Sequence, residues 1–231
     1  MRDAFEDQLN DLLQKVMRMG GLAEAMLDAA VRSLLVDDPK LAAEVYDRER
    51  QVNTLQSEVD EDAVRITVQF QPVARDVRFV FVATRAATDV ERVGDLAVNV
   101  YQNARHASDG SPDAPVRTPV DLAAMADRVR RMLGDALTAL VARDVALAER
   151  VLAAEDEVDR YRDRVFHAML DAMLPDQAAA QRAMSFVLIA RNLERIGDHA
   201  TNVAEDVIYL VRGRDVRHPY DKPNRAAVAG R

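Results

Sequence analysis

A repeated motif constrains the fold of this chain more than any other feature of its sequence. Residues 89–99 read DVERVGDLAVN, and residues 192–202 read NLERIGDHATN. The Glu, Arg, Gly, Asp, Ala and Asn of the two segments coincide when Glu91 is aligned with Glu194, which lies 103 residues further on. A repeat at this distance predicts two copies of one structural unit.

A second, weaker match lies upstream of each motif. Residues 38–45 (DPKLAAEV) resemble residues 144–151 (DVALAERV), and the similarity continues from Glu49 to Glu155 at a separation of 106 residues. The two separations differ by only three residues, which fits a small length change in one connection. The repeat therefore extends over most of the chain.

The joint between the two copies is marked by composition. Segment 108–118 is the one dense stretch of Ser, Gly and Pro, which is typical of a linker. We therefore expect one unit over 1–107 and another over 119–212. Segment 213–231 is expected to be a poorly ordered tail.

Long helices are predicted by the scarcity of residues that break them. The 231 residues include only 8 Gly and 8 Pro, so the fold class is all-α. In the first half we expect helices over about 3–36, from Pro39 (capped by Asp38) to about 70, and from Pro72 to about 107. Pro119, Asp144 and Pro175 mark the corresponding starts in the second half. Six long helices with short connections predict two tandem three-helix bundles.

Composition also excludes several kinds of site. The chain has no cysteine, so a metal would have to be bound by oxygen or imidazole ligands. A formal net charge of −8 disfavours nucleic acid as a partner. We see no signal peptide and no apolar run of the roughly 18 residues needed to span a membrane.

Carboxylates interrupt the apolar rows of the third and sixth helices. Steps of four and three residues, the spacing of a packing seam, connect apolar positions with two acids in each helix. The rows are Val77, Phe81, Thr84, Thr88, Glu91, Asp95 and Val98, and Ala180, Met184, Val187, Arg191, Glu194, Asp198 and Thr201. Asn99 and Asn202 extend the polar part and are further candidate metal ligands. We expect these acids to face inward.

The second and fifth helices offer partners for these acids. Glu49 and Glu155 lie among apolar residues, and Asn53 and Asp159 follow four residues later on nearly the same face. Buried carboxylates are costly unless they are paired or bind a metal, and hard cations prefer oxygen ligands. The pattern therefore predicts a metal site in each half. Gly94 and Gly197, inside the helices, suggest the close approach of a backbone or an ion.

Other interpretations of these residues stay open. The acids could form surface ion pairs with Arg92, Arg195, Arg85 or Arg191. His199 could be a metal ligand, although a partner or packing role fits better because the first copy has Leu96 there. A ferritin-like di-metal enzyme would need Glu-x-x-His motifs, which this sequence lacks. A helical scaffold without metal is a third alternative.

The repeated motifs resemble those of the PhoU family. The similarity rests on Glu91 to Asp95 with Asn99, on 194–202 continuing to IYLVRG at 208–213, and on PVARDVR at 72–78, and it covers about residues 1–213. This resemblance implies two three-helix bundles related by pseudo-twofold symmetry. It also implies a cytoplasmic negative regulator of the phosphate response, without catalytic turnover, that links the ATPase subunit of a phosphate ABC transporter to a sensor histidine kinase.

The same resemblance implies metal binding at defined positions. The metal positions carried over are Glu91 and Asp95 in the first half and Glu194 and Asp198 in the second, with Glu49, Asn53, Glu155 and Asp159 from the neighbouring helices. The metal could be Mg, Mn, Fe or Zn. The first site has Asn53 where the second has Asp159, so we expect weaker binding there. We further expect a homodimer that reaches the membrane only through its partners.

Overall fold

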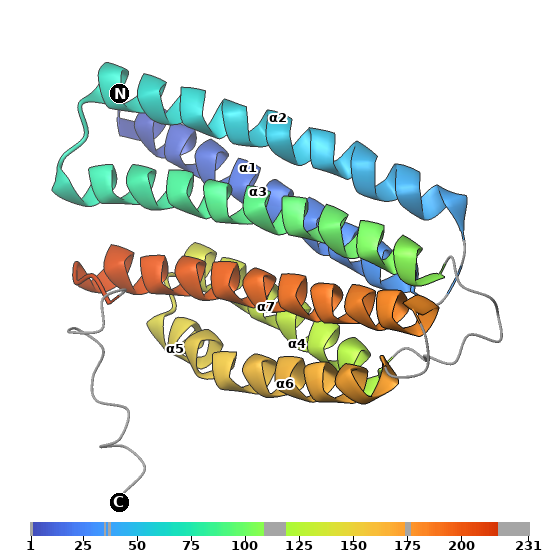
Figure 1. The fold of residues 1–231 in the computed structure, drawn as a ribbon. Coiled ribbons are helices and arrows are strands. Elements are labelled where there is room, and N and C mark those ends of the chain that lie inside the picture. The colour runs from blue at the N-terminus through green and yellow to red at the C-terminus, as the bar shows by residue number, and fades with distance from the viewer. Residues whose placement is uncertain (1, 35, 37, 109–118, 174–176, 217–231) are drawn as a thin grey trace, which may run out of the picture.

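A computed structural model describes residues 2–34, 36, 38–108, 119–173 and 177–216 (Figure 1). Within these residues all regular secondary structure is helical, which confirms the predicted fold class. No described helix has the length and hydropathy needed to span a lipid bilayer. The helices are α1 (Arg2–Arg32), α2 (Pro39–Phe70), α3 (Ala74–Ser108), α4 (Val120–Ala142), α5 (Val145–Ala153), α6 (Glu155–Ala172) and α7 (Gln177–Arg212).

The predicted helix starts depend on capping aspartates. The Lys40 amide donates to Asp38 Oδ1 over 2.9 Å at the start of α2, and the Leu147 amide donates to Asp144 Oδ1 over 3.0 Å at the start of α5. Two other predicted boundaries were wrong by a few residues, because α1 ends at Arg32 and α3 begins at Ala74. Residues 109–118, Pro175 and residues 217–231, on which predictions were also made, lie outside the described residues.

The fifth predicted helix is divided at Ala154, so the described chain has seven helices instead of six. The Ala154 amide donates to the carbonyl of Val151, and the Glu157 amide donates to that of Ala154. These three-residue spacings tighten the backbone locally. Glu155, Asp156 and Glu157 form the first turn of α6, where acidic side chains interact favourably with the helix dipole.

The helices form two bundles that lie side by side. α1, α2 and α3 pack together, and α4, α5, α6 and α7 do the same. The most extensive packing between any two helices joins α3 to α7, which run alongside each other through the middle of the molecule (Figure 1). α1 also contacts α4. The two copies of the repeat therefore share one continuous core.

Gly94 and Gly197 reveal how closely the two copies correspond. A Cβ at Gly94 would lie 3.6 Å from Met26 and 3.7 Å from Val52, and a Cβ at Gly197 would lie 3.6 Å from Val158 and 3.8 Å from Met132. Each pair of neighbours is a Met and a Val, 106 residues apart in the sequence. These are ordinary contacts with side chains, so the expectation that another backbone comes close at these glycines was wrong.

Gly20 provides the close approach instead. A Cβ on this residue of α1 would collide with Cδ1 of Leu137 in α4. Its neighbour Gly21 has open space around it. Gly20 therefore lets α1 and α4 pack tightly across the boundary between the two copies.

Candidate functional site

The acidic rows lie at the edge of the packed core, where the side chains of Glu91 and Glu194 are only 18% and 23% exposed and that of Asp95 is 38% exposed. Phe81 and Thr88, which belong to the predicted row on α3, are exposed, Phe81 to 58%. The buried stripe of α3 consists instead of small and β-branched residues, including Val82, Ala83, Ala86, Val90, Val93 and Ala97. The prediction that the acids face inward was correct only in part, because these alanines and valines form the core, although larger side chains stand beside them. The acids border the core and reach solvent.

The first acidic cluster consists of Glu49, Glu91 and Asp95. Arg92 Nη1 lies 3.1 Å from Asp95 Oδ2, and its Nε lies 3.5 Å from Glu91 Oε2. Burial raises the pKa of the Glu91 carboxyl, and the charges of Asp95 and Glu49 raise it further, whereas Arg92 and His199 oppose the shift. The three carboxylates therefore repel one another, and one arginine compensates them only in part.

The second acidic cluster consists of Glu155, Asp159, Glu194 and Asp198. Arg162 contacts Glu194, and its Nη1 lies 3.1 Å from Asp159 Oδ1. Burial raises the pKa of Asp198, and the charges of Glu194, Glu155 and Asp159 add to that effect. Asp198 keeps solvent contact, so water and salt screen the repulsion and reduce its cost to stability. Of the four acids, Arg162 contacts Glu194 and Asp159, and it also pairs with Asp163 next to it.

A polar link between α3 and α7 lies between the two clusters. Asp89 Oδ1 is 2.8 Å from His199 Nδ1 and accepts a hydrogen bond of 3.0 Å from Asn202 Nδ2. The interpretation of His199 as a partner residue is thereby confirmed. His199 partly offsets the rise in the pKa of Glu91 and of Asp198. It therefore lies near both clusters.

The hydrogen bonds that the structure shows for the predicted asparagines are made with residues outside the two acidic clusters. Asn202 is engaged with Asp89, and Asn53 and Asn99 are exposed. Asn99 contributes its backbone carbonyl, which accepts a hydrogen bond from the Asn103 side chain. The residues that the structure brings together on this face are therefore the seven carboxylates.

Arginines form ion pairs with several of the acids, as the ion-pair interpretation expected. Of the four arginines named in that interpretation, Arg92 pairs with carboxylates of the first cluster. Arg85 pairs with the buried Asp206 of α7 at 3.3 Å. Sequence reasoning missed Arg162 as a partner and missed Asp89 entirely. Arg162 stands three residues after Asp159 on the same helix, a spacing that could have indicated an ion pair.

The donor set suits a hard cation, because it offers only carboxylate oxygens. As the side chains are placed, no group of three or more His, Asp or Glu among the described residues is arranged to hold a metal ion. Arg92 and Arg162 occupy oxygens that a metal would need. A cation could enter only if these two side chains turned away.

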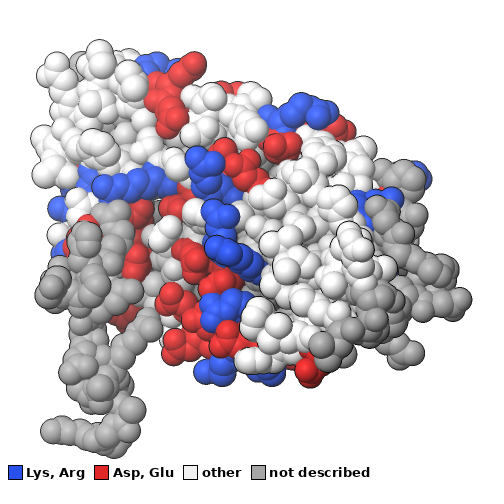
Figure 2. Space-filling model, in the orientation of Figure 1, with Lys and Arg blue, Asp and Glu red and all other residues white. Residues whose placement is uncertain are grey.

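Exposed apolar side chains flank the acidic clusters at equivalent positions of the two copies. Phe81 in α3 corresponds to Met184 in α7, and Val64 in α2 corresponds to Leu170 in α6; all four are exposed large apolar residues. Figure 2 shows acidic and basic side chains interleaved along the face formed by α2, α3, α7 and α6. We call the surface that carries the seven carboxylates of the two clusters the acidic face.

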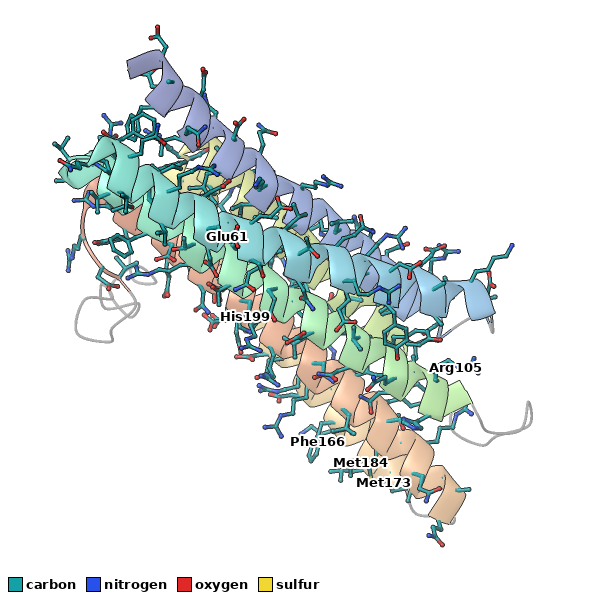
Figure 3. The ribbon with its side chains drawn as sticks, turned by 90° about the horizontal axis from the view of Figure 1, so that it is seen from above. Glu61, Arg105, Phe166, Met173, Met184 and His199 are labelled. Carbon is teal, nitrogen blue, oxygen red and sulfur yellow. The ribbon has the colours of Figure 1, made fainter. Side chains whose placement is uncertain are left out.

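A groove between α6 and α7 joins the charged residues of the second acidic cluster to exposed apolar residues. Its lining includes Arg162 and Glu194 of the second cluster together with Phe166 and Val187. Phe166 and Met184 lie near each other at one end of these helices, and His199 lies farther along α7 (Figure 3). The geometry therefore combines a charged centre with an apolar end in each half, which suits contact with another protein better than enclosure of a small substrate.

The sequence is similar to a known protein family in both halves of the chain. The PhoU domain profile matches residues 16–104 and 122–207. The phosphate-specific transport system accessory protein PhoU homolog of Pseudomonas putida is 35% identical over 226 residues, which cover 98% of this chain and 88% of that protein. The phosphate-specific transport system accessory protein PhoU of Escherichia coli is 30% identical over 214 residues, 93% of this chain and 88% of that protein.

Solved structures show the same fold. The crystal structure of PhoU from Pseudomonas aeruginosa matches with a TM-score of 0.84 and 35% identity over 91% of this chain and 100% of that chain. The phosphate transport system regulatory protein PhoU from Streptococcus pneumoniae matches with a TM-score of 0.83 at 22% identity, over 93% of this chain and 100% of that chain. With both halves matched by the domain profile and nearly the whole chain aligned to these relatives, the protein belongs to the PhoU family.

Proposed function

We propose that this protein is a cytoplasmic regulatory adaptor that acts with a phosphate ABC transporter. In this proposal it contacts the transporter's ATPase subunit and a sensor histidine kinase, and it represses the response to phosphate starvation. Relatives are named as accessory proteins of the phosphate-specific transport system, which supports a role beside the transporter. The proposed role involves no catalytic turnover.

The observation that carries the proposal is the paired apolar surface. Phe81 and Met184 occupy equivalent positions of the two copies and are exposed to 58% and 47%. Large apolar side chains that recur on one face and border charged groups are typical of protein interfaces. Since the core does not use these side chains, we assign them to contact with the ATPase subunit.

Metal binding at the two acidic clusters is a second part of the proposal. A divalent or trivalent cation, such as Mg, Mn, Fe or Zn, would neutralise carboxylates whose burial, together with the repulsion of neighbouring acids, raises the pKa of Glu91 and Asp198. Glu91 and Asp95 with Glu49, and Glu194 and Asp198 with Glu155 and Asp159, would supply the oxygens. The cation would displace Arg92 and Arg162, and these arginines would then be free to contact a partner.

Direct binding to the purified ATPase subunit tests the adaptor role. We expect the wild-type protein to bind, and Phe81→Ser combined with Met184→Ser to weaken the affinity at least about tenfold, because apolar anchors dominate interface energies. Val36→Ser is the matched control, since Val36 is also 58% exposed but lies in the connection between α1 and α2. Equal affinities for all three proteins would contradict the proposal.

Self-association must be measured in the same experiment, because we also propose a homodimer. Sedimentation of the wild type and of the double variant separates the two uses of the apolar surface. Loss of a dimer with unchanged binding to the ATPase subunit would assign Phe81 and Met184 to the dimer interface and refute their role in docking.

A further inference from the structure

A hollow outside the acidic face is lined by three arginines. It lies where α3 begins, α7 ends and α4 gives way to α5, and its volume is about 380 Å³. Arg75, Arg78 and Arg143 line it together with a single carboxylate, Asp76. Phe79 and Leu210 contribute an apolar wall. Figure 2 shows basic side chains at the end of the molecule where α3 begins.

The charges of these arginines are not taken up by acids in the part of the chain that the structure describes. Arg78 lies over the ring of Tyr209, 5.3 Å from its centre, and Arg143 lies over the ring of Phe79 at 5.5 Å. Neither forms an ion pair with a described residue, and the same holds for Arg75. Each guanidinium carries five N–H donors, so the hollow presents many donors to a bound anion.

The second copy of the repeat shows that the fold itself does not require two of these arginines. At the separation of 103 residues, Arg75 corresponds to Ala178 and Arg78 to Gln181. α7 thus begins with uncharged residues at the positions where α3 has arginines. The basic character belongs to this one end of the molecule and not to the bundle architecture.

Arg143 adds a backbone observation. It ends α4 in the left-handed region, with φ 53° and ψ 37°, where Gly or Asn is strongly preferred at a helix end. Its backbone amide makes the capping bond to Ala139 that any non-proline residue could make. A non-glycine residue in this conformation carries some strain, and Gln71 ends α2 in the same way.

We propose that this hollow binds a phosphate group, either free orthophosphate or the phosphate of a larger small molecule. Arginine forks match phosphate oxygens in geometry and charge, and the first turn of α3 adds the positive end of a helix dipole. Asp76 and the carboxyl end of α7 oppose the anion, which leaves three positive charges against one negative. The protein as a whole carries a net charge of −8, so an anion should bind at this positively charged hollow and be repelled elsewhere. This inference does not depend on the adaptor role or on metal binding.

Calorimetric titration with orthophosphate tests the proposal. The titration is run with EDTA, so that metal at the acidic face cannot recruit phosphate, and it is repeated with sulfate, citrate and ATP, with adenosine as the phosphate-free reference. We expect saturable binding of orthophosphate, of ATP, or of both, with citrate at least tenfold weaker. Binding of ATP alone would identify a larger phosphate-bearing molecule as the ligand.

Variants locate the binding and separate it from folding. Arg75→Ala combined with Arg78→Gln installs the residues of the second copy and should raise the dissociation constant at least tenfold. Arg143→Gly should raise it at least fivefold while the melting temperature stays equal or increases, because glycine relieves the left-handed strain. Arg131→Ala, at an exposed arginine of α4, should leave the affinity unchanged.

Three results would overturn the proposal. The first is no binding of orthophosphate or ATP by the wild type. The second is citrate affinity equal to that of phosphate. The third is binding that persists in both arginine variants or falls equally in Arg131→Ala.

Discussion

Asp89 of α3 and His199 of α7 meet across the boundary between the two copies of the repeat, with Oδ1 2.8 Å from Nδ1. Both side chains are largely buried, and Asn202 donates to the same oxygen. The first copy has Leu96 where the second has His199, so the link has no counterpart elsewhere in the part of the molecule that the structure describes. It lies between the two acidic clusters and fixes the position of one relative to the other.

Removal of the Asp89 carboxylate should destabilise the protein. Asp89→Ala leaves the His199 and Asn202 donors without their acceptor, which should lower the free energy of unfolding by about 1–3 kcal/mol. Urea denaturation followed by circular dichroism measures this change. Asp135→Ala, at an exposed position of α4, should change stability by less than about 0.5 kcal/mol. Equal effects of the two substitutions would show that the link contributes nothing.

Because the pKa values of Glu91 and Asp198 are raised, neutral substitutes at these two positions should increase the free energy of unfolding, by an amount that depends on pH. Each carboxyl binds its proton more tightly in the folded than in the unfolded protein, so its ionised form costs stability at neutral pH and this cost disappears on acidification. Glu91→Gln and Asp198→Asn should therefore each stabilise the metal-free protein at pH 7. The gain should be about 0.5 kcal/mol, a small value because solvent screens these groups.

Denaturation in EDTA between pH 4 and pH 7 measures that gain. It should shrink steadily as the pH falls toward 4, close to the ordinary pKa of carboxyl groups, because the wild-type side chains become protonated, more completely in the folded than in the unfolded state. Asp135→Asn serves as the exposed control, with no expected change over the same range. A gain that grew on acidification would contradict the expected direction of the pKa shifts.

Arg162 should compete with metal at the second cluster. Its guanidinium contacts Glu194 and Asp159, so Arg162→Gln removes a positive charge from the place that a cation would take. We expect Mn²⁺ to bind at least about fivefold more tightly to this variant. Arg164→Gln is the matched control, because Arg164 pairs with Asp121 away from the cluster. Manganese titration by electron paramagnetic resonance gives the affinities, and weaker binding to Arg162→Gln would count against competition.

The adjacent glycines of α1 should respond to alanine in opposite ways. Gly20→Ala forces a methyl group against Leu137 of α4 and should cost about 1–3 kcal/mol. Gly21→Ala meets open space and should gain about 0.5–1 kcal/mol in the helix interior. Thermal denaturation of both variants tests this contrast. Equal changes would mean that α1 and α4 do not pack closely at Gly20.

Local signals made much of the fold predictable. Asp38 and Asp144 cap α2 and α5 as the sequence indicated, because capping depends on a few neighbouring residues. The grouping of Glu49 with Glu91 and Asp95 also followed from spacing along two helices, and the charges of Glu49 and Asp95 both act on Glu91. Periodicity and repetition carried this information.

The direction in which the acids face could not be predicted in the same way. The row through Phe81 and Glu91 looked like a packing seam, whereas Ala86, Val90 and Ala97 are the buried residues of α3. α3 packs against α1, α2 and α7 together, and small residues allow that close approach. The contact between Asp89 and His199 depends on this packing of two copies, and neither residue is repeated in the other copy.

In the proposed function, the carboxylates of the acidic face bind a hard cation in each half of the molecule. Anomalous diffraction from crystals grown with Mn²⁺ tests it most directly, because it places the metal and identifies the element. We predict one peak among Glu49, Glu91 and Asp95 and a stronger one among Glu155, Asp159, Glu194 and Asp198, with Arg92 and Arg162 turned away. A map without peaks at these carboxylates, with both arginines still paired to them, would contradict the claim.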